Sequence, residues 1–154
     1  MKIAKCIWVV GAGLLIFQPA YAQKNISYDV AGVFATQDKD GDGDNALGLG
    51  LGINYFFHEN MGVGLDSYAA GIDWPYLLNA SFIYRFSSLK PVTPYGFAGF
   101  GRQWQHAPQW MGHLGGGVEY AFASGRSIFG DARWVLPDST GSYGVLRVGV
   151  RFGF

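Results

Sequence analysis

The feature that most constrains the fold is an alternation of large apolar residues with glycine or charge, clearest at the end of the chain. From Leu146 to Phe154, every second residue is large and apolar, and the residues between them are arginine or glycine. Successive side chains of a β-strand point to opposite faces of the sheet, so a period of two is typical of a strand. The pattern therefore predicts a strand with one apolar face and one face of glycine and charge.

The same period of two recurs along the chain, in runs separated by turn residues. No segment after the first 22 residues has the apolar stripe of an amphipathic helix. The sequence therefore predicts eight consecutive strands, at Ile26–Gln37, Ala46–Phe57, Met61–Ala70, Tyr76–Phe86, Pro94–Gln105, Trp110–Phe122, Ser127–Asp138 and Tyr143–Phe154.

Residues 1–22 are expected to be a cleaved signal peptide. Lys2 and Lys5 precede the apolar run CIWVVGAGLLIF, and the small residues of Ala20-Tyr21-Ala22 fit a cleavage site. The predicted mature domain is then 23–154. Cys6, the chain's single cysteine, lies within the leader, so no disulfide is expected to stabilise the domain. The slightly acidic mature charge gives no reason to expect a nucleic-acid partner.

Composition indicates which face of the strands is covered, and by what. Charged residues make up only 14% of the chain and aromatic residues 17%, whereas roughly a quarter of the residues of a soluble domain are charged. Alternation alone also fits a soluble sandwich or a lipocalin-like barrel, but the non-apolar face here is rich in glycine and carries ionisable groups in mid-strand, as suits a narrow interior. Aromatic pairs end several apolar faces, a girdle pattern seen in membrane barrels: Tyr55/Phe57, Tyr84/Phe86, Tyr120/Phe122 and Phe152/Phe154.

Lipid-facing strands predict a closed sheet, because every backbone polar group in hydrocarbon must be paired within the protein. The expected fold is all-β, an eight-stranded antiparallel up-and-down transmembrane β-barrel.

The segments PYGFAGFGR, HLGGGVEYAF, DARWV and VGVRFGF resemble the second half of the small OmpA/OmpX-type outer-membrane β-barrel domains. The resemblance implies a place in the outer membrane of a Gram-negative cell, as a monomer among lipids that include lipopolysaccharide. It also implies partners during biogenesis, the barrel-assembly machinery and periplasmic chaperones. In that family the last strand is the assembly signal, here Val148, Val150, Phe152 and Phe154.

The inward faces define the candidate site, a charge network in the lumen. Its expected members are Asp29, Asp66, Arg85, Arg102, His113, Glu119, Asp131, Arg133, Arg147 and Arg151. Isolated buried charges are costly and must pair, and the interior of an eight-stranded barrel is just wide enough for side chains to fill. We therefore expect a lumen plugged by salt bridges, with a narrow low-conductance pore as the alternative.

A lipid A-modifying enzyme, such as a deacylase, is the second alternative. His113 and Glu119 share a strand and a face, but the deacylase pattern has serine two residues after its histidine, where this chain has Gly115. A catalytic triad is recognised by geometry rather than by spacing alone. We therefore predict no catalytic residues, no cofactor and a structural or surface-interaction role.

The acidic run DKDGDGDN begins with the spacing of a calcium-binding loop. Its carboxylates are those of Asp38, Asp40, Asp42 and Asp44, but the twelfth position, which should be glutamate, is Leu49. The run is therefore expected to be the first outer loop, a polar turn, with weak divalent-cation binding as the alternative.

Overall fold

The protein is described here by a computed structural model that covers residues 25–39, 42–70, 76–86, 91–104, 108–139 and 141–153, without the side chains of 37–39 and 42–44. The expected signal peptide and Phe154 of the expected assembly signal lie outside the described residues. Within them, no helix is long and apolar enough to cross a membrane.

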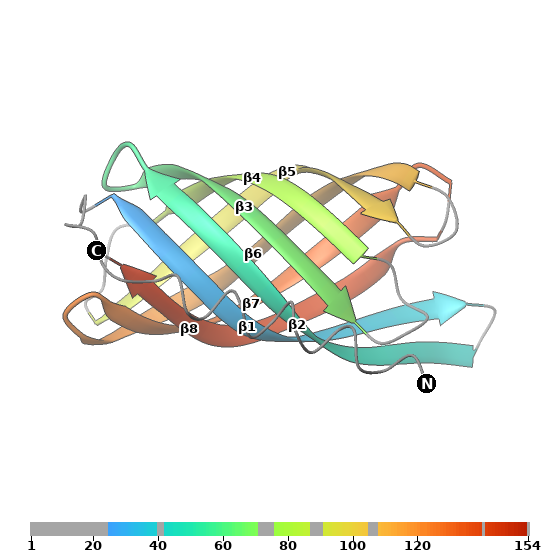
Figure 1. Ribbon diagram of the computed structural model, residues 1–154, viewed down its shortest axis with the longest axis horizontal. Coiled ribbons are helices and arrows are strands. Elements are labelled where there is room, and N and C mark those ends of the chain that lie inside the picture. The colour runs from blue at the N-terminus through green and yellow to red at the C-terminus, as the bar shows by residue number, and fades with distance from the viewer. Residues whose placement is uncertain are drawn as a thin grey trace, which may run out of the picture.

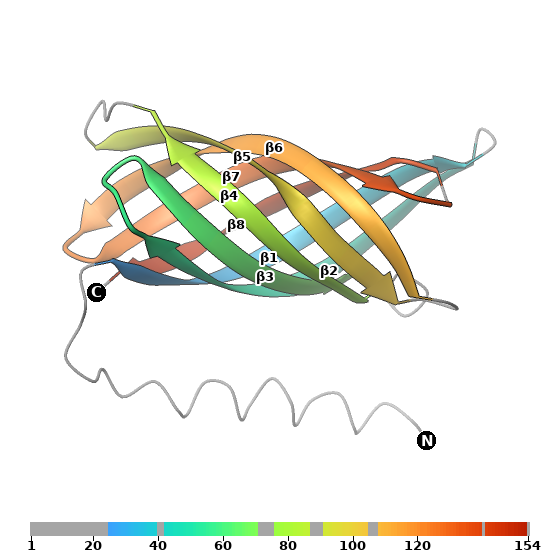
Figure 2. The same ribbon diagram turned by 90° about the horizontal axis from the view of Figure 1, so that it is seen from above.

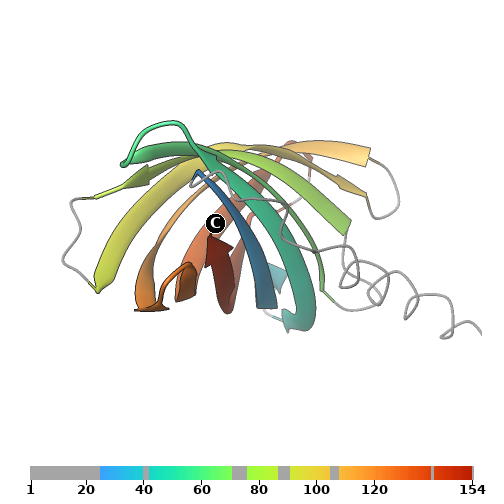
Figure 3. The ribbon, with the colours of Figure 1, turned by 60° about the vertical axis from the view of Figure 1, so that its left-hand side comes forward.

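Eight strands form one closed barrel in which each strand pairs antiparallel with its neighbours in the sequence, and the last pairs with the first. Figures 1 and 2 show the strands inclined to the long axis, and Figure 3 shows them curving around it. The strands are β1 (Ile26–Lys39), β2 (Asp42–Phe56), β3 (Met61–Ala70), β4 (Tyr76–Arg85), β5 (Val92–Trp104), β6 (Pro108–Ala123), β7 (Arg126–Pro137) and β8 (Tyr143–Gly153). The predicted number, order and fold class are confirmed.

Burial alternates along the strands in the predicted sense, with the apolar faces outward. Val148 is 64% exposed, whereas its neighbour Arg147 is 7% exposed. Large side chains on the outer surface come from every strand, among them Phe34, Leu49, Leu65, Phe82, Phe100, Leu114, Ile128 and Leu146. An exterior this apolar around the whole barrel is suited to acyl chains and not to water.

The first two strands extend further than the sequence indicated. The ladder of β1 and β2 continues to Lys39↔Asp42, so Asp38, Asp42 and Asp44 have strand backbone and do not belong to a loop. The prediction of a loop over the whole acidic run was therefore wrong. Only 40–41 lie between the strands and outside the description.

This hairpin projects beyond the rest of the barrel (Figures 1 and 2). The pairing of β1 with β8 stops at Thr36↔Gly144, and that of β2 with β3 stops at Gly48↔Ala70. Past those points the two strands pair only with each other among the described residues, which leaves two free edges there. Charged residues on a free edge oppose pairing with another chain, and this gives the acidic run a structural explanation.

Glycines on the inner face allow neighbouring strands to approach closely. At Gly149 of β8, a Cβ atom would collide with the carbonyl oxygen of Val30 and lie 2.8 Å from the Cα atom of Ala31. At Gly112 of β6, on the outer face, a Cβ atom would have no neighbour within 4 Å. The inner glycine is therefore required by backbone packing, and the outer one is not.

We predict that Gly149→Ala destabilises the folded barrel by about 1–3 kcal/mol, the usual cost of adding atoms to a packed site. Gly112→Ala, the matched control, should leave stability nearly unchanged. The measurement is the urea midpoint of folding in lipid vesicles, followed by the faster migration of unboiled folded protein in gels. Equal midpoints for the two variants would contradict the packing argument.

Candidate functional site

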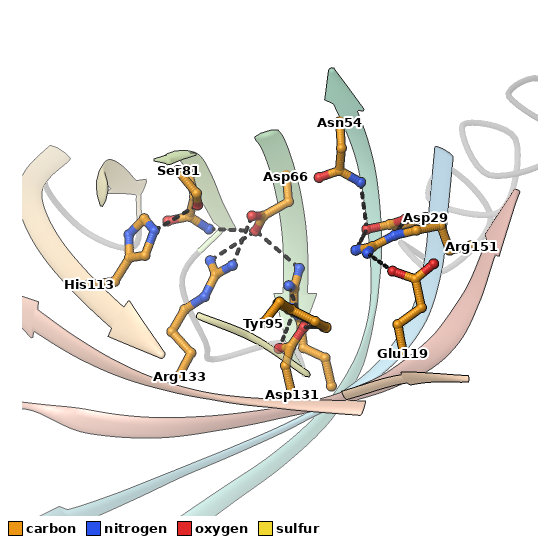
Figure 4. A network of polar contacts seen from close by, with 12 residues as sticks. Asp29, Asn54, Asp66, Ser81, Tyr95, His113, Glu119, Asp131, Arg133 and Arg151 are labelled. Carbon is orange, nitrogen blue, oxygen red and sulfur yellow. Dashed lines mark hydrogen bonds and ion pairs between the residues drawn. The ribbon is translucent and has the colours of Figure 1, made fainter. Parts of the chain in front are cut away.

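The lumen holds two chains of ion pairs that together join four carboxylates to four guanidiniums. The participating residues come from six of the eight strands and point inward toward one another, as the labelled side chains in Figure 4 show. Opposite charges are therefore equal in number in the described interior.

The first chain of ion pairs crosses the barrel near the start of β1 and the end of β8. Arg151 donates through Nε and Nη2 to both oxygens of Asp29, at 2.7 and 2.8 Å. Its third nitrogen, Nη1, donates to Glu119 Oε2 at 2.7 Å, and Arg85 donates to the same oxygen at 3.0 Å. Neutral donors complete the chain, with Asn54 bonded to Asp29 at 3.0 Å and Ser127 to Glu119 at 2.7 Å.

The second chain lies further along the axis. Arg133 donates two hydrogen bonds to the carboxylate of Asp66, at 2.9 and 2.8 Å. Arg147 also makes a bidentate contact, with two hydrogen bonds of 2.8 Å to Asp131. Its Nη1 atom lies 3.5 Å from Asp66 Oδ2. Paired nitrogen–oxygen contacts of this kind are shorter and stronger than neutral hydrogen bonds.

Aromatic rings separate and orient the guanidiniums. Phe97 lies 5.0 Å from the guanidinium carbon of Arg133, and Phe129 lies 5.0 Å from that of Arg151. Tyr95 has two contacts, because its ring lies 5.5 Å from Arg151 and its hydroxyl donates to Asp131 at 2.8 Å. Rings at this distance attract cations through their electron-rich faces, so Arg133 and Arg151 have aromatic contacts in addition to their ion pairs.

Nine of the ten expected lumen residues do face the interior, and Arg102 does not. Arg102 pairs across the sheet with Leu78 on one side and Trp110 on the other, both of which are exposed on the outer surface. Cross-strand partners share a face, so the prediction that Arg102 belongs to the lumen network was wrong. The buried inward side chains of β5 are those of Tyr95, Phe97 and Gln103.

His113 contacts a serine rather than a carboxylate. Its Nε2 lies 2.9 Å from Ser81 Oγ, and both residues are buried (Figure 4). Its Nδ1 has no hydrogen-bond partner in the described part of the chain. No short-range sequence pattern indicates this pair, because Ser81 and His113 are 32 positions apart.

An apolar segment fills the half of the lumen nearer the β1–β2 hairpin. Its core is formed by buried side chains that share the inward parity of the charges: Val33, Ala35, Ala46, Tyr68, Ala70, Leu77, Met111, Val135, Tyr143 and Val145. The Tyr143 hydroxyl donates to Gln103 Oε1 at 3.0 Å. The sequence analysis did not predict this apolar layer, although the alternation that directs the charged residues into the lumen also directs these residues there.

Two cavities lie among the charged residues of the lumen. A cavity of about 190 Å³ opens at the end where β1 starts and β8 stops, and Arg85, Glu119 and Arg151 help to line it. Between the two ion-pair chains there is only about 10 Å³ of further space, beside Asp66 and Arg147. One water needs at least roughly 10–15 Å³, so this space does not hold a column of water.

Within the described residues, no three histidine, cysteine or carboxylate side chains form a group that could hold a metal ion. The side chains of Asp38, Asp40, Asp42 and Asp44 lie outside the description, so weak cation binding there stays a prediction.

The fold is shared with known transmembrane barrels. The chain is similar to the crystal structure of Neisserial surface protein A, with 16% identity over 84% of this chain and 97% of that one, at a TM-score of 0.69. It is also similar to the N-terminal β-barrel domain of OprF from Pseudomonas aeruginosa, with 19% identity over 87% and 100% and a TM-score of 0.65. No protein-family model and no curated protein matches the sequence.

A de novo designed transmembrane β-barrel is similar to the same extent, with 13% identity over 87% of this chain and 98% of that one, at a TM-score of 0.66. Likeness to a designed barrel means that the fold does not by itself specify an activity. The shared architecture and the apolar exterior define the chain as an eight-stranded β-barrel of the outer-membrane type. The fold expected from the OmpA/OmpX resemblance is thereby confirmed, and the outer-membrane location is supported.

We predict that Arg147→Ala destabilises the barrel by about 3–5 kcal/mol, because it leaves Asp131 buried without a cation. The matched control is Arg85→Ala, because Arg85 lies at the end of the other chain of ion pairs. Its side chain is 23% exposed, and Glu119 keeps Arg151 as a partner. The control should show a clearly smaller loss of folding free energy in urea titrations in lipid vesicles. Equal losses would contradict the proposed weight of the central pairs.

Proposed function

We propose that the protein is a monomeric integral outer-membrane barrel of the OmpA/OmpX type, with a sealed lumen and a structural or surface-interaction role without catalysis. The observation that supports this proposal is that paired charges and then buried apolar side chains follow one another along the lumen. Neither layer alone would account for a seal as well as the two in series.

The two layers oppose ion passage for different reasons. In the charged layer each carboxylate already has an arginine, so an entering ion would have to break a desolvated pair. In the apolar layer an ion would lose its hydration with nothing to replace it. This arrangement favours a plug over the narrow pore, and the 190 Å³ cavity remains a vestibule open at one end.

The orientation and partners follow from the outer-membrane proposal. The open end, with the start of β1 and the end of β8, would face the periplasm, and the β1–β2 hairpin would extend outward toward lipopolysaccharide. Val148, Val150 and Phe152 lie on the lipid-facing side of β8, which supports their role as part of the signal for the barrel-assembly machinery.

The lipid-modifying alternative has one observation in its favour, the pair of Ser81 and His113 at 2.9 Å. Nucleophilic catalysis would need a third group to orient the histidine and room for a substrate. His113 Nδ1 lacks a partner among the described residues, and both side chains are enclosed in the lumen, away from the lipid-facing surface. We therefore assign the pair to packing.

We predict that the purified protein shows no conductance steps above baseline in planar bilayers, because both layers of the lumen are filled. The Tyr68→Ala/Tyr143→Ala variant lacks two large side chains of the apolar layer and should show a higher conductance. Trp110→Ala/Trp134→Ala removes similar bulk from the outer face and should not. Steady openings of the unmodified protein would refute the sealed lumen.

We predict that lipid A from cells producing the protein has the same mass spectrum as lipid A from cells without it, since no substrate can reach Ser81. Cells producing the Ser81→Ala variant should also give this spectrum. A loss or gain of one acyl chain that appears with the protein and vanishes in Ser81→Ala would establish the enzyme instead.

A further inference from the structure

Arg102 is a charged side chain on the face of the barrel that meets lipid. Of the described outward-facing side chains within the strands, only those of Arg102 and Arg126 carry a charge at neutral pH. Arg126 is the first residue of β7, at the vestibule end. Arg102 lies two residues before the end of β5, at the opposite end of the barrel.

No carboxylate neutralises Arg102 in the part of the chain that the structure describes. Each of the four inward-facing arginines has an ion pair, whereas the outward-facing Arg102 has none with a described residue. Its Nε is buried and has no hydrogen-bond acceptor. An unpaired guanidinium beside hydrocarbon is costly, so a partner from outside the protein would relieve that cost.

Two tryptophans hold this guanidinium at its place. The ring of Trp110, its cross-strand neighbour, lies 5.4 Å from the guanidinium carbon, and that of Trp104 lies 5.8 Å from it. Tyr76 pairs with Trp104 on the next strand, so the site lies within a belt of exposed aromatic side chains. Such belts mark the depth of lipid headgroups.

We infer that Arg102, flanked by Trp104 and Trp110, forms a binding site for a lipid phosphate at the outer rim of the barrel. A phosphate group offers anionic oxygens to a planar guanidinium fork, which can contact two of them at once. The two indole rings flank the guanidinium carbon, and no carboxylate of the described residues binds its nitrogen atoms, which are left for the ligand. The headgroup depth selects a phosphate carried by a lipid, either the monoester of lipid A or the diester of a phospholipid.

The inference rests on the proposed outer-membrane placement, and its test separates the two. The protein is folded in dodecyl maltoside, which contains no phosphate, and the faster gel migration of unboiled protein reports the barrel independently. Native mass spectrometry then measures the retention of added bis-phosphorylated lipid A, enzymatically dephosphorylated lipid A and phosphatidylglycerol.

Wild-type protein should retain phosphorylated lipid A in preference to the dephosphorylated form, a comparison that needs no variant. Arg102→Gln should lower this retention about ten-fold, the scale of one charge-assisted contact, and Arg102→Lys should restore part of it. Arg126→Gln, the matched control at the other end, should retain as much as wild type.

The site would be overturned if wild-type protein retained phosphorylated and dephosphorylated lipid A equally. It would also be overturned if Arg102→Gln retained as much phosphorylated lipid A as wild type, or if Arg126→Gln lost as much retention as Arg102→Gln. None of these results would change the gel shift. Loss of the gel shift in wild-type protein would instead overturn the membrane barrel itself. Retention of lipid A alone would identify the monoester as the ligand, and equal retention of phosphatidylglycerol would extend the site to the diester.

Discussion

The structure depends on one constraint, which is that backbone polar groups surrounded by hydrocarbon must find their partners within the protein. Eight antiparallel ladders satisfy it only because β8 returns to pair with β1. Closure with so few strands makes the interior narrow. The narrow interior in turn explains why glycines such as Gly149 face inward, where a methyl group would meet the backbone of the next strand.

A narrow interior must also be filled without leaving charge unpaired. Two ion-pair chains do so near the vestibule, and rings such as Phe97 and Phe129 take the spaces between guanidiniums. Beyond them the filling is apolar, from Val33 to Val145. Exterior and interior thus exchange the roles they have in a soluble barrel, since the apolar band lies outside and the buried polar network within.

The sequence alone was sufficient for the fold class, the strand order and the parity of most strands, because each strand repeats its two-residue pattern several times. It failed at β5, where aromatic residues occupy both faces, so that Tyr95 and Phe97 inward and Phe100 and Trp104 outward look alike. Arg102 was misplaced for this reason. Pairings such as Arg133 with Asp66, 67 positions apart, depend on barrel curvature and on which strands face each other across the lumen. No short-range pattern encodes these distances.

The contact between Arg151 and Asp29 joins the last strand to the first, across 122 positions of the chain. Secreted domains commonly secure their ends with a covalent bridge between sulfur atoms, an option absent from 25–153, where there is no cysteine. Here the first and last strands are joined by the ion pair of Arg151 with Asp29 instead. This ion pair is reversible and needs no oxidant, and it adds to the backbone ladder that already joins β8 to β1.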